Sequence, residues 1–190
     1  PATRHTPLRL LYMVRCKHLS REYGVRIEEM TETLHQLSQS GLRLHKQYAD
    51  AMVAHALEDD PNECCGILAG KDGRVLRLFR MTNVEHSPFR YSMDGKEMLK
   101  VLNEIDGNGW ELLAIYHSHT HTPAYPSATD VRLATWPDAY YLLVSLMDKT
   151  SPVLRAFHIV DGMLKEEPLT IGASFIFPAH TNSYGLRNGI

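Results

Sequence analysis

Apolar and polar residues alternate with two different periods along the chain, and the changes of period separate strands from helices. Residues 42–46 alternate as a short strand, and residues 47–58 and 94–105 repeat with the period of an amphipathic helix. Further apolar runs have the length and composition of strands, and they cover residues 64–69, 75–81, 110–116, 140–147, 153–160 and 163–170.

Two Asp-Gly pairs mark hairpin turns between neighbouring runs, at residues 72–73 and 161–162. Residues 127–135 add a short helix between the strands at 110–116 and 140–147. The resulting order of strands and helices predicts an α+β or mixed α/β fold, in which two or three helices pack on one sheet.

The two ends of the chain differ from this regular part. Residues 1–40 form an N-terminal extension, in which residues 26–38 carry one apolar helical stripe that ends at Gly41. This helix could lie on the surface of the main domain or join two copies in a homodimer. Residues 41–172 are the predicted domain, and residues 173–190 form a polar C-terminal tail that we expect to be loosely held.

Composition restricts the function classes. Hydrophobic residues make up 44% and charged residues 22% of the chain, as in ordinary globular proteins. The net charge of −2 gives no basic field for nucleic acid or an anionic membrane, and no apolar run approaches the about 20 residues of a membrane span. Three cysteines do not form a disulfide framework, so we read the adjacent Cys64 and Cys65 as small buried thiols and expect a cytoplasmic protein.

The histidines are unevenly distributed. Three of the 11 histidines fall within five residues, at His117, His119 and His121. In an extended segment, residues two apart point to the same side, so His117 and His119 can offer two nitrogens to one metal ion. Two histidines and a carboxylate form a catalytic zinc ligand set, and Asp130 is a carboxylate within reach of a folded loop.

Spacing alone leaves alternatives open at each neighbouring position. His121 could complete a three-histidine site in place of Asp130. Ser127 and Asp130 also fit the capping box of a short helix, a structural role that does not exclude a catalytic one. Glu63, directly ahead of an apolar strand, could be a general base whose pKa is raised by burial, or a solvated loop acid.

Two motifs in this order resemble the JAMM (MPN-plus) zinc peptidases. His117, His119, Ser127 and Asp130 reproduce the signature H-x-H-x7-S-x2-D, and residues 61–70 (PNECCGILAG) resemble the upstream segment P-x-E-x-C-G-x-L-x-G. The likeness extends over about residues 42–172 and implies a cytidine-deaminase-like MPN fold with a mixed, curved sheet. Thr120 departs from the pattern, because many members carry proline there, but the change removes no functional group.

The resemblance implies a role for each motif residue. His117, His119 and Asp130 would bind Zn²⁺, Glu63 would be the general acid and base, and Ser127 would stabilise the oxyanion. It also implies that His121 is not a ligand.

The segments 89–94, 116–127 and 137–140 are similar to the small bacterial members of the family. This similarity implies an enzyme that releases cysteine from the C-terminal tail of a ubiquitin-fold sulfur-carrier protein, with the tail added as an extended strand. The alternatives are an isopeptidase that removes ubiquitin-like modifiers from lysine, and a metal-free MPN scaffold, which would need none of the five motif residues. A zinc nucleoside deaminase would need H-x-E and P-C-x-x-C motifs, which the sequence lacks.

Overall fold

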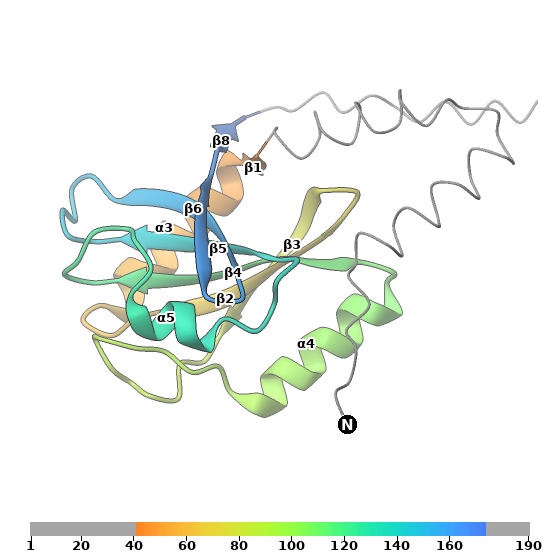
Figure 1. The fold of residues 1–190 in the computed structure, drawn as a ribbon, viewed down its shortest axis with the longest axis horizontal. Coiled ribbons are helices and arrows are strands. Elements are labelled where there is room, and N and C mark those ends of the chain that lie inside the picture. The colour runs from red at the N-terminus through yellow and green to blue at the C-terminus, as the bar shows by residue number, and fades with distance from the viewer. Residues whose placement is uncertain (1–40, 174–190) are drawn as a thin grey trace, which may run out of the picture. The chain divides into compact units, whose positions relative to one another are not determined.

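A computed structural model of the protein describes residues 41–173 (Figure 1). The expected helix at residues 26–38 and the C-terminal tail lie outside the described residues, so the division of the chain into three parts stays a prediction. The elements are β1 Leu42–His45, α3 Lys46–Asp59, β2 Cys65–Lys71, β3 Arg74–Met81, α4 Gly95–Gly107, β4 Glu111–His119, α5 Ala128–Leu133, β5 Tyr140–Ser145, β6 Val153–Val160, β7 Met163–Glu167 and β8 Leu169–Gly172.

Six strands form one mixed sheet in the order β3-β2-β4-β5-β6-β7. Only β4 and β5 run parallel, and the helix α5 lies in the connection between them. All other neighbours are antiparallel, as expected for hairpin connections. β4 is therefore an interior strand, paired on both sides, and it carries the two motif histidines at its end.

Helices cover both faces of the sheet. α3 packs Met52 and Ala56 against one face, together with Tyr116 of β4. α4 packs Val101 and Ile105 against the other face, and α5 lies on that face too. Alternate residues of β2 and β4 consequently enter different cores, which explains why these strands read as continuous apolar runs. The predicted α+β class, with a mixed sheet and three helices, is confirmed for the described residues.

Both Asp-Gly turns are present. Asp72 and Gly73 have φ values of 51° and 70°, and Asp161 and Gly162 have 51° and 76°. Left-handed values at both central positions are those of the type I′ turn, which suits the twist of a two-stranded hairpin. The turns connect β2 to β3 and β6 to β7.

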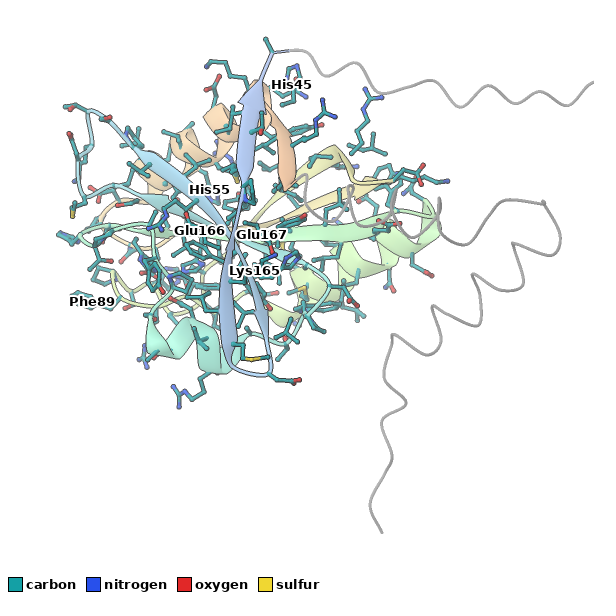
Figure 2. The ribbon with its side chains drawn as sticks, turned by 45° about the horizontal axis from the view of Figure 1, so that its top comes forward. His45, His55, Phe89, Lys165, Glu166 and Glu167 are labelled. Carbon is teal, nitrogen blue, oxygen red and sulfur yellow. The ribbon has the colours of Figure 1, made fainter. Side chains whose placement is uncertain are left out.

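The prediction of a single last strand at residues 163–170 was wrong. Pro168 divides this segment, because proline has no N–H to donate to a strand ladder. β7 pairs with β6, whereas β8 leaves the main sheet and pairs in parallel with β1. The carbonyl of Pro168 accepts from Leu42 N at 2.8 Å, which fixes the start of β1 beside the start of β8. In Figure 2 the labelled residues Lys165, Glu166 and Glu167 mark the end of β7 just before this division.

Two further boundaries differ from the sequence prediction. β4 continues past Tyr116 to His119, so both histidines belong to the strand itself. α5 ends at Leu133, two residues earlier than predicted, and the chain after it is extended.

Candidate metal and catalytic site

The histidines lie at the end of β4, on the face covered by α4 and α5. His117 is paired in register with Cys65 of β2 and Leu143 of β5, and its side chain is 1% exposed. His119 is two residues further on, at the last position of the strand, and is also buried. Their Nε2 atoms are 3.2 Å apart, so the strand alternation brings both nitrogens to one point.

Asp130 reaches these nitrogens from the first turn of α5. Ser127 is the N-cap of this helix, and its Oγ accepts from Asp130 N at 3.2 Å. In return, Asp130 Oδ2 accepts from Ser127 N at 2.6 Å. The expected capping box is therefore present, and the same hydrogen bonds hold the carboxylate of Asp130 toward the histidines.

The three donor groups have the spacing of a metal ligand set. Asp130 Oδ1 is 3.5 Å from His117 Nε2, and Asp130 Oδ2 is 3.4 Å from His119 Nε2. The two imidazole nitrogens are 3.2 Å apart, each faces one oxygen of the same carboxylate, and one ligand atom of each residue lies within 4.8 Å of the others. A tetrahedral zinc ion with bonds of about 2.0–2.1 Å requires ligand atoms about 3.3 Å apart. The donor set fits such an ion, and a fourth corner is left for other ligands.

Hydrogen bonding fixes the orientation of His119. Its Nδ1 lies 3.0 Å from the carbonyl oxygen of Pro123, which can only accept. Nδ1 therefore carries the proton, and in the neutral ring Nε2 presents a lone pair to the cluster. His117 is held differently: its ring stacks on Tyr91 at 4.5 Å, and its Nδ1 has no partner among the described residues.

Charges within the cluster are coupled. Burial lowers the pKa of His117, which keeps this ring neutral. Burial also opposes the protonation of His119, but hydrogen bonds to Asp130 and Pro123 outweigh it and raise the pKa. Burial alone would raise the pKa of Asp130, whereas the two histidines hold it well below its usual range. Asp130 is thus an anion facing two imidazoles, the protonation state that a divalent cation needs.

A second acid, Glu63, interacts with this cluster. Glu63 precedes β2 and is buried, with 4% of the residue exposed. Its carboxyl interacts electrostatically with His119 and Asp130. Burial raises its pKa to about 7, although the attraction of His119 works in the opposite direction. A carboxyl with this pKa can take up and release a proton near neutral pH, as a general acid and base must.

Sequence reasoning missed the loop between β3 and α4, which builds one wall of the site. Asn83 Nδ2 donates to the carbonyl of Glu63 at 2.9 Å, and Glu63 N donates to the carbonyl of Ser87 at 2.9 Å. Tyr91, from the same loop, supplies the ring that stacks on His117. No spacing rule points to Asn83 or Ser87, because both bond to the main chain of Glu63 and depend on the folded loop. Tyr91 lies in the segment 89–94 that is similar to the small bacterial members, but spacing does not reveal its contact with His117.

Ser118, between the two histidines, points to the other face and ties β4 to the residue after Glu63. Its Oγ accepts from Cys64 N at 2.8 Å, and its own N donates to Cys64 O at 3.1 Å. Both cysteines are buried, as expected, and burial raises the pKa of the Cys64 thiol to about 12.

His121 lies away from the cluster. It is exposed, and its Nδ1 is 2.6 Å from the hydroxyl of Thr120. Thr120 is buried and its hydroxyl also contacts the carbonyl of Pro88, so the threonine joins the strand end to the loop between β3 and α4. Within the described residues, the candidate metal-binding group consists of His117, His119 and Asp130 and does not include His121.

A groove of about 310 Å³ opens beside Asp130. Residues 90–93 and the start of α4 form one side, while α5 and the segment after it form the other. Val84 N donates to Ser92 O at 2.9 Å, and Asp94 N donates to Thr82 O at 3.1 Å. Since backbone groups alternate in an extended segment, those of Tyr91 and Met93 face away from residues 82–84.

Comparison with known proteins places the chain in a family. Residues 45–160 match the prokaryotic homologs of the JAB domain. The chain belongs to this family. The resemblance inferred from the two motifs is thereby confirmed, since JAB and MPN denote the same domain.

Several curated members of the family are similar over most of their length. A CysO-cysteine peptidase of Mycobacterium tuberculosis is 48% identical over 132 residues, which are 68% of this chain and 90% of that protein. A desampylase of Haloferax volcanii is 36% identical over 116 residues, covering 57% of this chain and 84% of that protein. A probable TtuB-protein conjugate cleaving protease of Thermus thermophilus is 40% identical over 110 residues, covering 57% of this chain and 70% of that protein.

Solved structures agree with the fold. A protein from Desulfitobacterium hafniense has a TM-score of 0.63 and 39% identity, over 70% of this chain and 93% of that chain. One from Salinibacter ruber has a TM-score of 0.51 and 28% identity, over 68% of this chain and 91% of that chain. In residues 41–173, no helix is long and apolar enough to cross a membrane.

Proposed function

We propose that this JAB-domain protein is a zinc peptidase that hydrolyses an amide bond at the C-terminus of a ubiquitin-fold protein. The observation that carries the proposal is the cluster of His117, His119 and Asp130, whose neighbouring donor atoms are 3.2, 3.4 and 3.5 Å apart, close to the spacing of ligands around a tetrahedral zinc ion. These three residues would hold the ion, which when bound acts as a Lewis acid and lowers the pKa of water.

Glu63 would move the protons of the reaction. Hydrolysis adds the hydroxyl of water to the carbonyl carbon and transfers the proton to the leaving amine nitrogen. A carboxyl with a pKa of about 7 can accept that proton from water and donate it to the nitrogen in turn.

Ser127 would meet the charge that develops on the carbonyl oxygen. Its Oγ uses a lone pair to cap α5, because Asp130 N donates to it. The hydroxyl proton is therefore free to be donated to an oxyanion. The cap also limits the movement of the hydroxyl, so the donor is oriented before the reaction begins.

For the substrate, we favour a sulfur-carrier protein with a cysteine joined to its C-terminus. The 48% identical relative is named for such an activity, and the match spans 90% of its length. The groove beside Asp130 supports binding of an extended tail, because Tyr91 and Met93 line it and their backbone groups are turned away from residues 82–84. Main-chain hydrogen bonds of this kind recognise a glycine-rich tail, which lacks side chains.

A second candidate is an isopeptidase that separates a ubiquitin-like protein from lysine. The relatives from Haloferax and Thermus, named a desampylase and a conjugate cleaving protease, favour it. Both activities break an amide after the same kind of tail and differ in the amine that leaves.

A direct comparison of two substrates tests the proposal. The zinc-loaded protein is incubated with a sulfur-carrier protein bearing a C-terminal cysteine and with a ubiquitin-like protein joined to a lysine side chain. We expect rapid release of cysteine and slow cleavage of the lysine conjugate. The reverse order would establish the isopeptidase, and cleavage of neither would contradict the proposed function.

A further inference from the structure

Asn83 lies in the loop that connects β3 to α4, and its side-chain amide makes four hydrogen bonds. Nδ2 donates to the carbonyl oxygens of Glu63, at 2.9 Å, and Arg90, at 3.2 Å. Oδ1 accepts from the backbone N–H groups of Glu85, at 3.1 Å, and Ser92, at 3.0 Å. An amide has two donor hydrogens and two acceptor lone pairs, so all four are used.

The side chain is also buried, with 6% of the residue exposed. A buried amide with four hydrogen bonds is held in one orientation, because any rotation would leave polar groups without partners. Asn83 is therefore a rigid connection between the two ends of this loop and the residue that precedes β2.

The loop in turn contacts both halves of the candidate site. Ser87 accepts from Glu63 N, so the peptide groups on both sides of the Glu63 side chain are fixed by the loop. Tyr91, between the two loop positions that Asn83 bonds, stacks on His117 at 4.5 Å. Thr120 adds a contact from the strand end to the carbonyl of Pro88.

We propose that Asn83 is a positioning residue for the hydrolytic reaction, which places the Glu63 carboxyl against the metal site by fixing the Glu63 main chain. This inference rests on the proposed function. None of the four side-chain hydrogen bonds of Asn83 goes to His117, His119 or Asp130, so Asn83 acts through Glu63 and the loop. Its replacement should change the rate of the chemical step and not substrate binding. All four hydrogen-bonding positions of its amide are already used within the protein, so none can bond to a substrate.

The variant Asn83→Asp keeps the acceptor function of the amide and removes its donor function. A carboxylate can still accept from Glu85 N and Ser92 N, which preserves the loop, but it cannot donate to Glu63 O and Arg90 O. Asn83→Gln is the complementary variant, because it keeps the amide chemistry and moves it by one methylene. Asn108→Asp is the matched control, since Asn108 Nδ2 donates to the carbonyl of Glu104 at the exposed end of α4.

One readout does not depend on activity. Hydrogen exchange of the Glu63 amide, which is bonded to Ser87 O, is measured in the zinc-loaded proteins by NMR. We expect exchange at least tenfold faster in Asn83→Asp than in the wild type and unchanged in Asn108→Asp. Exchange that is unchanged in Asn83→Asp would show that Asn83 does not hold Glu63 and would overturn the inference.

The kinetic readout uses the substrate that the wild type cleaves. In both Asn83 variants we expect about one zinc ion per chain, a KM within twofold of the wild type and a kcat at least tenfold lower. A kcat within twofold, an effect confined to KM, loss of zinc, or loss of folding in both variants would each overturn the inference. If the wild type cleaves neither substrate, the proposed function fails, and the exchange measurement still decides the structural role of Asn83.

Discussion

Replacement of Glu63 by glutamine should stabilise the metal-free protein at neutral pH and remove its activity. Burial raises the pKa of Glu63 from its ordinary 4.5 to about 7, so the folded state binds a proton that the unfolded state has released between these values. Stability contributed by the protonated carboxyl is present below pH 4.5 and is lost as the pH rises through about 7. Glutamine resembles the protonated side chain in shape and carries no charge to bury.

The size of the effect follows from the interval between the two pKa values. At about 1.4 kcal/mol for each pH unit, the interval from 4.5 to about 7 corresponds to about 3 kcal/mol. The variant and the wild type should therefore be equally stable well below pH 4.5. Above pH 7 the metal-free Glu63→Gln variant should be more stable by about 3 kcal/mol.

Urea unfolding with a chelator present, followed by circular dichroism at several pH values, measures this difference. Glu58→Gln is the control of opposite sign. The hydrogen bond from Arg80 lowers the pKa of Glu58, so its contribution to stability is present at neutral pH and is lost as the pH falls. Its replacement should destabilise the protein at neutral pH. A stability difference between wild type and Glu63→Gln that does not change with pH would refute the reasoning about Glu63.

Three further predictions follow from the geometry. His119→Ala should lose zinc, measured by atomic emission after dialysis, whereas His121→Ala should retain about one ion per chain; loss of metal from His121→Ala would revive a three-histidine site. Ser127→Ala should lower kcat about 100-fold and the unfolding free energy by about 1 kcal/mol, and an unchanged kcat would leave Ser127 only a cap. Gly66→Ala should destabilise the protein by more than 2 kcal/mol, an order of magnitude set by overpacking, because its Cβ would overlap a buried tyrosine ring of β4. Gly95→Ala, where a Cβ meets open space, is the matched control, and equal unfolding midpoints for the two variants would contradict this reading.

Most of the fold could be predicted from periodicity, because long apolar runs and Asp-Gly turns report local structure directly. β2 and β4 were evident as continuous apolar runs, and the structure shows that each serves two cores. The division of residues 163–172 was not predicted. It depends on Pro168 and on the distant strand β1, which together make a separate pairing more favourable than one continuous strand.

The candidate site could be predicted where its residues follow one another at fixed spacing. His117 and His119 share a face because of strand alternation, and Asp130 is directed by its capping box with Ser127. The neighbours that hold Glu63 were not predictable in this way. Asn83 reaches it from 20 residues along the chain, through its main chain, and such contacts leave no pattern in a single sequence.

In the capping box, a single orientation of the Asp130 carboxylate serves both the helix cap and the candidate metal site. The carboxylate accepts from the N–H of Ser127, the N-cap of α5, and at the same time faces both imidazoles. Since the capping box would lose one of its two hydrogen bonds if this side chain moved, the fold itself orients the third member of the candidate metal site.

The central claim is that this chain adds water across an amide with Glu63 as the proton carrier. The most direct measurement is mass spectrometry of a sulfur-carrier protein bearing a C-terminal cysteine, incubated with zinc-loaded protein in heavy-oxygen water. We predict that the wild type releases unlabelled cysteine and leaves one heavy oxygen in the new carboxylate of the carrier, whereas zinc-loaded Glu63→Gln leaves the adduct intact. An intact adduct with the wild type, or equal cleavage by Glu63→Gln, would contradict the claim.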